Sequence, residues 1–307
     1  MKPASSMVTL AVPLLEPFRY DFFLRGLLAA VLVGALCGLV GVYIVLRRMS
    51  YIGHGLSHAV FGGAVVSYVL QLNFYLGAGL WGFVSALLIH AATRKRQIAA
   101  DAAIGIVTTA SFAIGVALIS RVRRFTRNFE AALFGNILGV TNEDLGVLVG
   151  VGLLVVLTIF LLYKQLLFTT FDPEVARLYG VKTNRVEAWF SLLLAATIIA
   201  SIQVMGVTLI AAAIVVPAIV ARLMTDSFST MLWLSALIGA LCGLVGIFAS
   251  FYLDISSGAT IVLVSALVFV FALGWTLLAS RRERFRVSVG PAAPQPARAA
   301  GIAGSFK

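Results

Sequence analysis

Charged residues are scarce in this chain. Asp, Glu, Lys and Arg make up 11% of its 307 residues, whereas they make up about 25% of a typical soluble domain. Hydrophobic residues account for 61%, and the mean hydropathy is +1.04. A helix that crosses the hydrocarbon core of a bilayer needs about 20 apolar residues. The composition therefore excludes a sizeable soluble domain and indicates several membrane crossings.

Motifs for nucleotide binding and catalysis are absent as well. The sequence holds no Gly-x-x-x-x-Gly-Lys-Ser/Thr phosphate loop, so we do not expect the chain to hydrolyse ATP itself. Its three histidines leave few options for general-base chemistry, and no nucleophile with a base and an orienting group is recognisable. The two cysteines, Cys37 and Cys242, lie in apolar runs where a thiol behaves as a small hydrophobic group. The sequence thus predicts neither an enzyme nor a permanently bound cofactor.

Long apolar runs fill most of the chain. Continuous runs of this kind lack the alternation of a membrane β-barrel, so the expected fold is all-α: a polytopic integral membrane protein with eight or nine transmembrane helices. Residues 1–286 are expected to form a single transmembrane domain, and the proline- and alanine-rich tail 287–307 is expected to be disordered. The predicted helices cover residues 22–46, 54–72, 76–93, 101–120, 144–163, 187–205, 206–221, 231–252 and 259–280.

Basic residues set the expected orientation. If all nine runs cross, 16 of the 23 Lys and Arg fall on one side of the membrane, which should be the cytoplasmic side. This model leaves Arg121, Arg123, Arg124 and Arg127 outside, so the short, proline-containing run 206–221 could be re-entrant instead. Because the basic residues lie in short segments between apolar runs, the net charge of +11 predicts membrane orientation and no nucleic-acid partner.

Two of the three histidines, His54 and His58, lie four residues apart at the start of an apolar run. That spacing places both imidazoles on one face of a helix, and polar groups in membrane helices usually face the bundle interior or a hydrated path. Two neutral imidazoles suit a borderline divalent metal such as Zn²⁺ or Fe²⁺. The alternative is that both rings bond backbone carbonyls of neighbouring helices. Asp101 is expected to cap a helix, with a secondary role in an ion path as the alternative, and His90 is expected at the membrane interface.

The segment around residues 172–180 predicts a short helix outside the bilayer on the cytoplasmic side. Asp172 and Pro173 are typical of a helix N-cap and first position, and Gly180 is typical of a helix end. Such a helix could dock a partner or simply connect two membrane helices.

One octapeptide, Gly-Ala-Leu-Cys-Gly-Leu-Val-Gly, occurs twice, at residues 34–41 and 239–246. Small residues four apart let two helix backbones approach closely in lipid. We therefore expect both segments in tightly packed helices. An internal duplication is the alternative.

Taken in order, these residues resemble the membrane-permease family of ABC importers for manganese, zinc and iron. The resemblance extends over some 210 residues and seven short motifs. The motifs are Leu46-Arg47-Arg48-Met49-Ser50 leading into Ser57-His58-Ala59-Val60; Asp101-Ala102-Ala103-Ile104-Gly105-Ile106-Val107; Leu133-Phe134-Gly135-Asn136-Ile137-Leu138; Phe171-Asp172-Pro173-Glu174; Val204-Met205-Gly206-Val207; Pro217 with Ala221-Arg222-Leu223; and Tyr252-Leu253-Asp254 with Ser257-Gly258-Ala259-Thr260.

The resemblance implies a transport subunit of the cell membrane that moves divalent Zn, Mn or Fe into the cytoplasm. The partners that it implies are a second permease subunit, expected to be a second copy, a separate cytoplasmic ATP-binding subunit, and an extracellular or periplasmic metal-binding protein. The short helix then resembles the helix that couples the permease to its ATPase. The residues implied for coupling are Asp172, Pro173, Glu174, Ala176, Arg177 and Gly180.

The family pattern also places a metal-contacting Asp and His four residues apart, at positions that correspond to His54 and His58. Here the usual Asp is a histidine. Carboxylate oxygen suits Mn²⁺, whereas imidazole favours Zn²⁺, Fe²⁺ or later metals, so this departure weighs slightly against manganese. Two other functions remain open from the sequence: an ABC permease for a metal chelate or vitamin, and a secondary metal transporter driven by an ion gradient.

Overall fold

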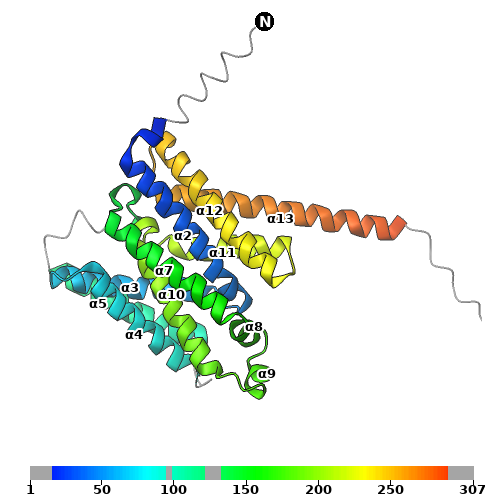
Figure 1. Cartoon of the computed structure of the whole chain (residues 1–307), viewed down its shortest axis with the longest axis horizontal. Coiled ribbons are helices and arrows are strands. Elements are labelled where there is room, and N and C mark those ends of the chain that lie inside the picture. Colours follow the sequence, from blue (N-terminus) through cyan, green and yellow to red (C-terminus); the bar gives the residue numbers. More distant parts are fainter. Residues whose placement is uncertain (1–15, 95–98, 122–132, 290–307) are drawn as a thin grey trace, which may run out of the picture.

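The computed structural model describes residues 16–94, 99–121 and 133–289, and these residues form helices without any strand (Figure 1). Each apolar run of the sequence corresponds to one long helix. The long helices are α2 (Asp21–Leu46), α3 (Tyr51–Val69), α4 (Phe74–Arg94), α5 (Ala100–Arg121), α7 (Asn142–Leu161), α10 (Thr183–Met205), α11 (Ile210–Met224), α12 (Phe228–Leu253) and α13 (Ser257–Val289). Four short elements complete the described part: η1 (Glu16–Arg19), η2 (Ile137–Gly139), α8 (Tyr163–Phe171) and α9 (Pro173–Leu178).

Seven of the described helices, namely α2, α4, α5, α7, α10, α12 and α13, are long and apolar enough to cross a membrane. Helix α3 falls short because its polar residues, including both histidines, lower its hydropathy, and α11 falls short because it has only 15 residues. The all-α, polytopic fold is confirmed, while the predicted count of eight or nine crossings is not. The predicted tail lies outside the described residues from position 290 onward, and α13 continues to Val289.

Contacts between helix ends show which of them lie at the same end of the bundle. The starts of α4 and α7 meet where Tyr75 donates a hydrogen bond of 2.5 Å to Asp144. At the opposite end, Arg47 contacts α8, and His90 of α4 lies 3.1 Å from Asn184 of α10. Consecutive helices therefore run in alternating directions, and the end that holds Arg47 and α9 is the end predicted to be cytoplasmic. Of the basic cluster predicted outside, Arg121 ends α5, and the other three residues lie outside the described ranges.

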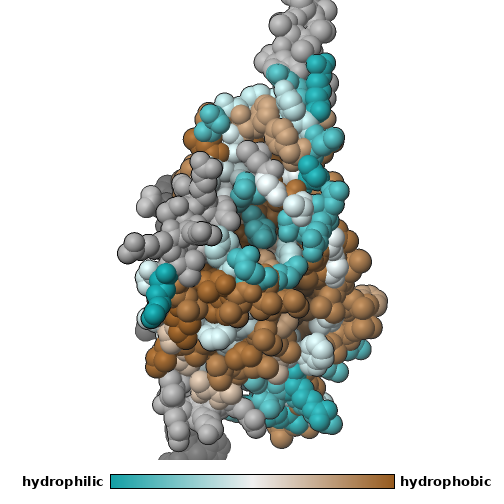
Figure 2. Space-filling model, turned by 90° about the vertical axis from the view of Figure 1, so that its left-hand side faces the viewer, coloured by the Kyte–Doolittle hydropathy of each residue, from teal (hydrophilic) through white to brown (hydrophobic). Residues whose placement is uncertain are grey.

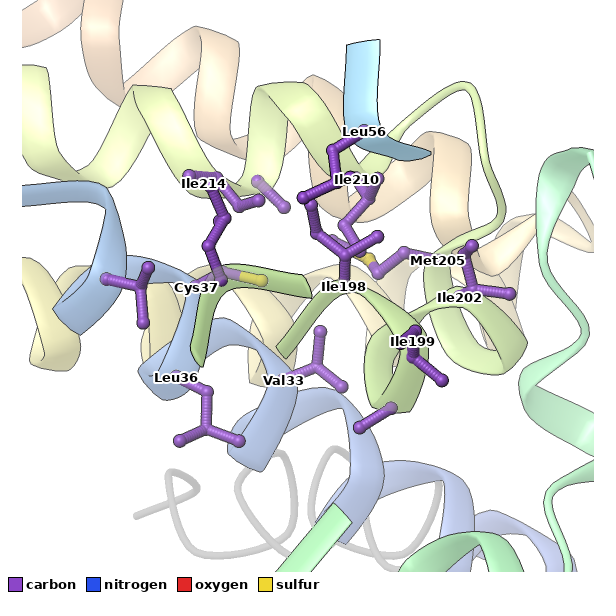
Figure 3. Packing of buried hydrophobic residues seen from close by; sticks show 14 of the residues in the cluster. Val33, Leu36, Cys37, Leu56, Ile198, Ile199, Ile202, Met205, Ile210 and Ile214 are labelled. Carbon is purple, nitrogen blue, oxygen red and sulfur yellow. The ribbon is translucent and has the colours of Figure 1, made fainter. Parts of the chain in front are cut away.

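The two octapeptides pack against each other. Helices α2 and α12 cross so closely that a Cβ on Gly34 would collide with the Gly239 carbonyl, and a Cβ on Gly239 with the Gly34 carbonyl. One turn away, the Ser235 hydroxyl donates a hydrogen bond of 2.7 Å to the Gly38 carbonyl. The expectation of tight packing is confirmed, because glycine is the residue that lets two helix backbones touch. Figure 3 shows residues of α2, α3, α10 and α11 that pack together in the core.

Helix α11 is short because the chain reverses sharply after α10. Gly206 has a φ of 76°, which favours glycine, and its backbone touches that of Gly135, whose φ is 79°. The Thr208 hydroxyl donates a hydrogen bond of 2.7 Å to the Leu133 carbonyl, which fixes this contact. From here α11 runs to Met224 as one helix with Pro217 inside it, toward the end of the bundle that holds α8. The run predicted as possibly re-entrant thus does not fold back on itself.

Hydrophobic side chains cover much of the outer surface. Figure 2 shows a broad hydrophobic area across one side of the molecule, with hydrophilic residues gathered toward its ends. Helices α5, α7 and α13 are the least covered, with 22%, 17% and 11% of their most apolar windows buried within the chain. Apolar surface of this extent is stable in contact with lipid or with another apolar surface.

Candidate metal site on helix α3

Helix α3 presents both histidines on one face. It starts at Tyr51, so His54 lies in its first turn and His58 in the second. Their ring centroids are 4.6 Å apart with the planes inclined by 70°. Tyr51 flanks His54 at 5.6 Å, and Phe112 of α5 packs edge-on against His58 at 5.2 Å. The pair is therefore held between two aromatic rings, with the two imidazoles in edge-to-face contact.

Both rings are half-buried, and neither has a hydrogen-bonding partner in the described part of the chain. The structure therefore does not contain the alternative arrangement, in which the imidazoles bond backbone carbonyls of neighbouring helices. The one hydrogen bond recorded at His54 is to its backbone carbonyl, which accepts from the Ser57 hydroxyl at 2.8 Å. Free ring nitrogens in a membrane helix are costly without a function.

Glycines on α3 bring α5 next to the pair. A Cβ on Gly55 would collide with the Ile104 side chain, and a Cβ on Gly62 would collide with the Ser111 carbonyl. The Thr108 hydroxyl oxygen lies 2.8 Å from the position where Gly55 would carry its Cβ. This oxygen is buried and has no hydrogen-bonding partner. No sequence pattern indicates Thr108, because only the packing of α5 on α3 places it beside Gly55, the residue that follows His54.

The other residues considered from the sequence form no hydrogen bond or ring contact with this pair in the described part of the chain. Asp101 is exposed in the first turn of α5, where a carboxylate interacts favourably with the helix dipole. His90 bonds Asn184 of α10, at the same end of the bundle as Arg47. Asp254 ends α12 with a φ of 52°. Over the described ranges, no group of three or more His, Cys, Asp or Glu side chains could hold a metal.

The described part of one chain therefore brings together two candidate ligands, which are fewer than a closed metal site needs. Imidazole nitrogens bind Zn²⁺ and similar ions at about 2.0–2.1 Å, usually as part of a set of four or more ligands. A set with only two protein ligands can accept an ion and release it again, which transport requires. An ion bound by this pair would need further ligands from water, from Thr108 or from another chain.

The end of the bundle predicted to be cytoplasmic carries the short helix predicted near residues 172–180. The Asp172 carboxylate accepts hydrogen bonds from the backbone of Glu174 and Val175 at 3.0 and 2.9 Å, and Pro173 is the first helical residue of α9. Gly180 has a φ of 79° and follows the end of the helix. Ala176 is buried and anchors α9 to the bundle.

Two large side chains near the end of α9 face away from the bundle. Leu178 is 86% exposed and Tyr179 is 78% exposed. Exposed apolar side chains outside the membrane mark a surface that another protein can cover. Neither residue was among those expected to couple the permease to a partner, although both lie in the same segment.

Comparison with known proteins agrees with this architecture. Residues 19–275 match the ABC 3 transport family. The manganese transport system membrane protein MntC of Halalkalibacterium halodurans is 38% identical over 253 residues, which cover 82% of this chain and 87% of MntC. The probable iron transport system membrane protein of Haemophilus influenzae is 33% identical over 268 residues, covering 87% of this chain and 98% of that protein.

Among solved structures, PsaBC from Streptococcus pneumoniae in complex with Fab superposes with a TM-score of 0.77 at 33% identity, covering 86% of this chain and 95% of that chain. An inward-facing putative metal-chelate type ABC transporter has a TM-score of 0.67 at 18% identity, which supports the fold alone. The family match spans most of the chain and all nine long helices begin within it. This chain is a multi-pass cell-membrane protein that belongs to the ABC 3 transport family, a metal-transporting ABC permease and not an enzyme.

Proposed function

We propose that this chain is the permease subunit of an ABC importer that moves divalent Mn, Fe or Zn into the cytoplasm. The observation that carries the proposal is the pair of half-buried, unbonded imidazoles of His54 and His58 on one face of α3. Relatives named for manganese and for iron transport support this group of cargo ions. Imidazole nitrogens bind all three ions, with the highest intrinsic affinity for the later metals.

The ion is bound directly by both histidines and not as part of a bulky chelate. Their ring centroids are 4.6 Å apart, a separation that fits a single ion bound to a nitrogen of each ring. The buried Thr108 hydroxyl is a further oxygen donor, either to the ion or to a water bound to it. Aromatic rings on both sides limit access to the pair along α3.

A second copy of the chain completes the site. Two imidazoles satisfy only half of a four-coordinate ion, and helix α5, which carries Thr108 and Phe112, is largely uncovered within one chain. A dimer that buries the outer face of α5 brings two histidine pairs to a common axis. In this arrangement all nine long helices cross the membrane, with the polar α3 and the short α11 shielded from lipid by their neighbours.

A separate ATP-binding subunit docks on the cytoplasmic end. The buried Ala176 and the Asp172 cap fix helix α9 to the bundle. A movement of α9 therefore displaces the helices that it contacts. Leu178 and Tyr179 provide the apolar contact surface. A metal-binding protein on the opposite side of the membrane delivers the ion.

Uptake by cells that carry the complete transporter tests the proposal. Replacing both histidines with alanine should abolish uptake of ⁵⁴Mn, ⁵⁵Fe and ⁶⁵Zn while the chain still inserts and still binds its ATPase, as measured by co-purification. The matched control is His90→Ala, because the His90 ring bonds Asn184 of α10 and neither histidine of the pair. Unchanged uptake by the double variant would refute the site, and uptake of a chelate in place of the free ions would refute the cargo.

A further inference from the structure

Arg47 is a partly buried arginine that lies between two parts of the chain to which functions are proposed above. It follows the last residue of α2, and its side chain reaches α8. Its Nε donates a hydrogen bond of 3.1 Å to the Thr170 hydroxyl, and an Nη donates one of 3.2 Å to the Thr169 hydroxyl. The guanidinium carbon also lies 4.5 Å from the centre of the Phe190 ring of α10. Two hydrogen bonds and one ring contact therefore fix the position of the guanidinium group.

Partial burial and three side-chain contacts make this arginine unlike an ordinary basic residue at a membrane surface. Burial lowers the pKa of the Arg47 guanidinium from its ordinary value, and the nearby Glu187 carboxylate partly opposes the shift. A buried cation is costly unless hydrogen bonds and nearby charges compensate it. The adjacent Arg48 is exposed and has no such contacts. Orientation of the chain needs only a charge at this end of α2, and Arg48 already supplies one.

On one side, Arg47 is tied to the helix that carries the histidines. The turn between α2 and α3 is tight: the backbone of Met49 donates to Ile44 at 3.0 Å, and Ile52 donates to Met49 at 2.9 Å. Arg48 has a φ of 55°, which makes the sharp bend. Only six residues separate Arg47 from His54, so a displacement of Arg47 moves the first turn of α3.

On the other side, Arg47 is tied to α9. Thr169 and Thr170 lie in the last turn of α8, directly before the Asp172 that caps α9. The Asp172 backbone N–H donates to Phe168 at 2.9 Å, which joins α8 to α9 without a flexible linker. A cavity of about 300 Å³ lies beside the guanidinium group and is lined also by Glu187 and Phe190. It leaves room for the guanidinium group to move.

We propose that Arg47 is a positioning residue that transmits movement of α9 to the histidine-bearing helix α3 through its hydrogen bonds to Thr169 and Thr170. The role rests on the proposed function, in which α9 receives the ATPase and His54 and His58 bind the ion. Metal release then follows from a shift of the α2–α3 turn. ATP hydrolysis drives metal transport only while the contact of Arg47 with Thr169 and Thr170 is present.

The test is the number of ions transported per ATP hydrolysed. The complete transporter, with its ATPase and its binding protein, is reconstituted in proteoliposomes and supplied with ATP and ⁵⁴Mn²⁺, ⁵⁵Fe²⁺ or ⁶⁵Zn²⁺. Arg47→Gln should lower this ratio roughly 3- to 30-fold, the range found for residues that carry coupling between sites, while ATP hydrolysis continues. Arg47→Lys keeps the charge but loses the fork, so it should restore only part of the ratio. Arg48→Gln is the matched control and should behave as wild type.

The outcomes separate the two proposals. A wild-type ratio in Arg47→Gln would overturn the role of Arg47 and leave the proposed function intact. A wild-type transporter that hydrolyses ATP but takes up none of the three ions would overturn the proposed function itself. If the Arg47 variants do not assemble, Thr170→Val removes the acceptor of the 3.1 Å hydrogen bond with little change of shape. A lowered ratio in Thr170→Val supports the inference, and an unchanged ratio overturns it.

Discussion

The buried hydroxyl of Thr108 allows a prediction in which stability and transport change in opposite directions. Its oxygen has no hydrogen-bonding partner in the structure. An unpaired buried polar group costs about 1–3 kcal/mol, so replacing it with a methyl group of the same size removes that cost. Thr108→Val should therefore raise the free energy of unfolding of the metal-free protein by about 1 kcal/mol.

The same substitution should weaken transport. If the hydroxyl binds the ion or its water, the loss of a hydrogen bond to a charged group costs about 1.5–3 kcal/mol, which raises the KM for the metal about tenfold or more. Thermal unfolding in detergent and uptake at increasing metal concentrations measure the two effects. Thr109→Val is the matched control, because Thr109 is exposed on the neighbouring position of the same helix. A variant that is less stable and transports normally would refute the reasoning.

Three further predictions follow from the site and the packing. His54→Asp replaces a nitrogen ligand with oxygen, so competition between ⁵⁴Mn and ⁶⁵Zn should shift toward manganese; an unchanged preference would argue against direct ligation by His54. Gly239→Leu should prevent folding, as measured by size-exclusion chromatography, because its Cβ collides with the α2 backbone, whereas Gly150→Leu meets nothing within 4 Å and should fold normally. Replacing Leu178 and Tyr179 with aspartate should abolish co-purification of the ATPase, since it removes their exposed apolar surface; retained association would place the docking surface elsewhere.

Most of the helices could be predicted from the sequence because hydropathy is a local property. Each predicted apolar run corresponds to a helix with ends displaced by a few residues, except α13, which continues to Val289. The exceptions in span assignment have a clear cause: α3 is less apolar because it carries polar residues that include His54 and His58, and α11 is shortened by the contact of Gly206 with Gly135. Positions 71 residues apart in the chain decide that contact, and no local pattern encodes it.

The sequence by itself determined that the chain is a bundle of membrane helices, that its basic residues gather at one end, and that His54 and His58 share a helix face. These properties depend on composition and on the period of 3.6 residues per turn. Only the tertiary structure decided which helices touch. It placed Thr108 beside Gly55, one octapeptide against the other, and Arg47 on a threonine 123 residues away. Such contacts depend on how whole helix surfaces fit together, and hydropathy does not specify that fit because every lipid-exposed or buried face is apolar.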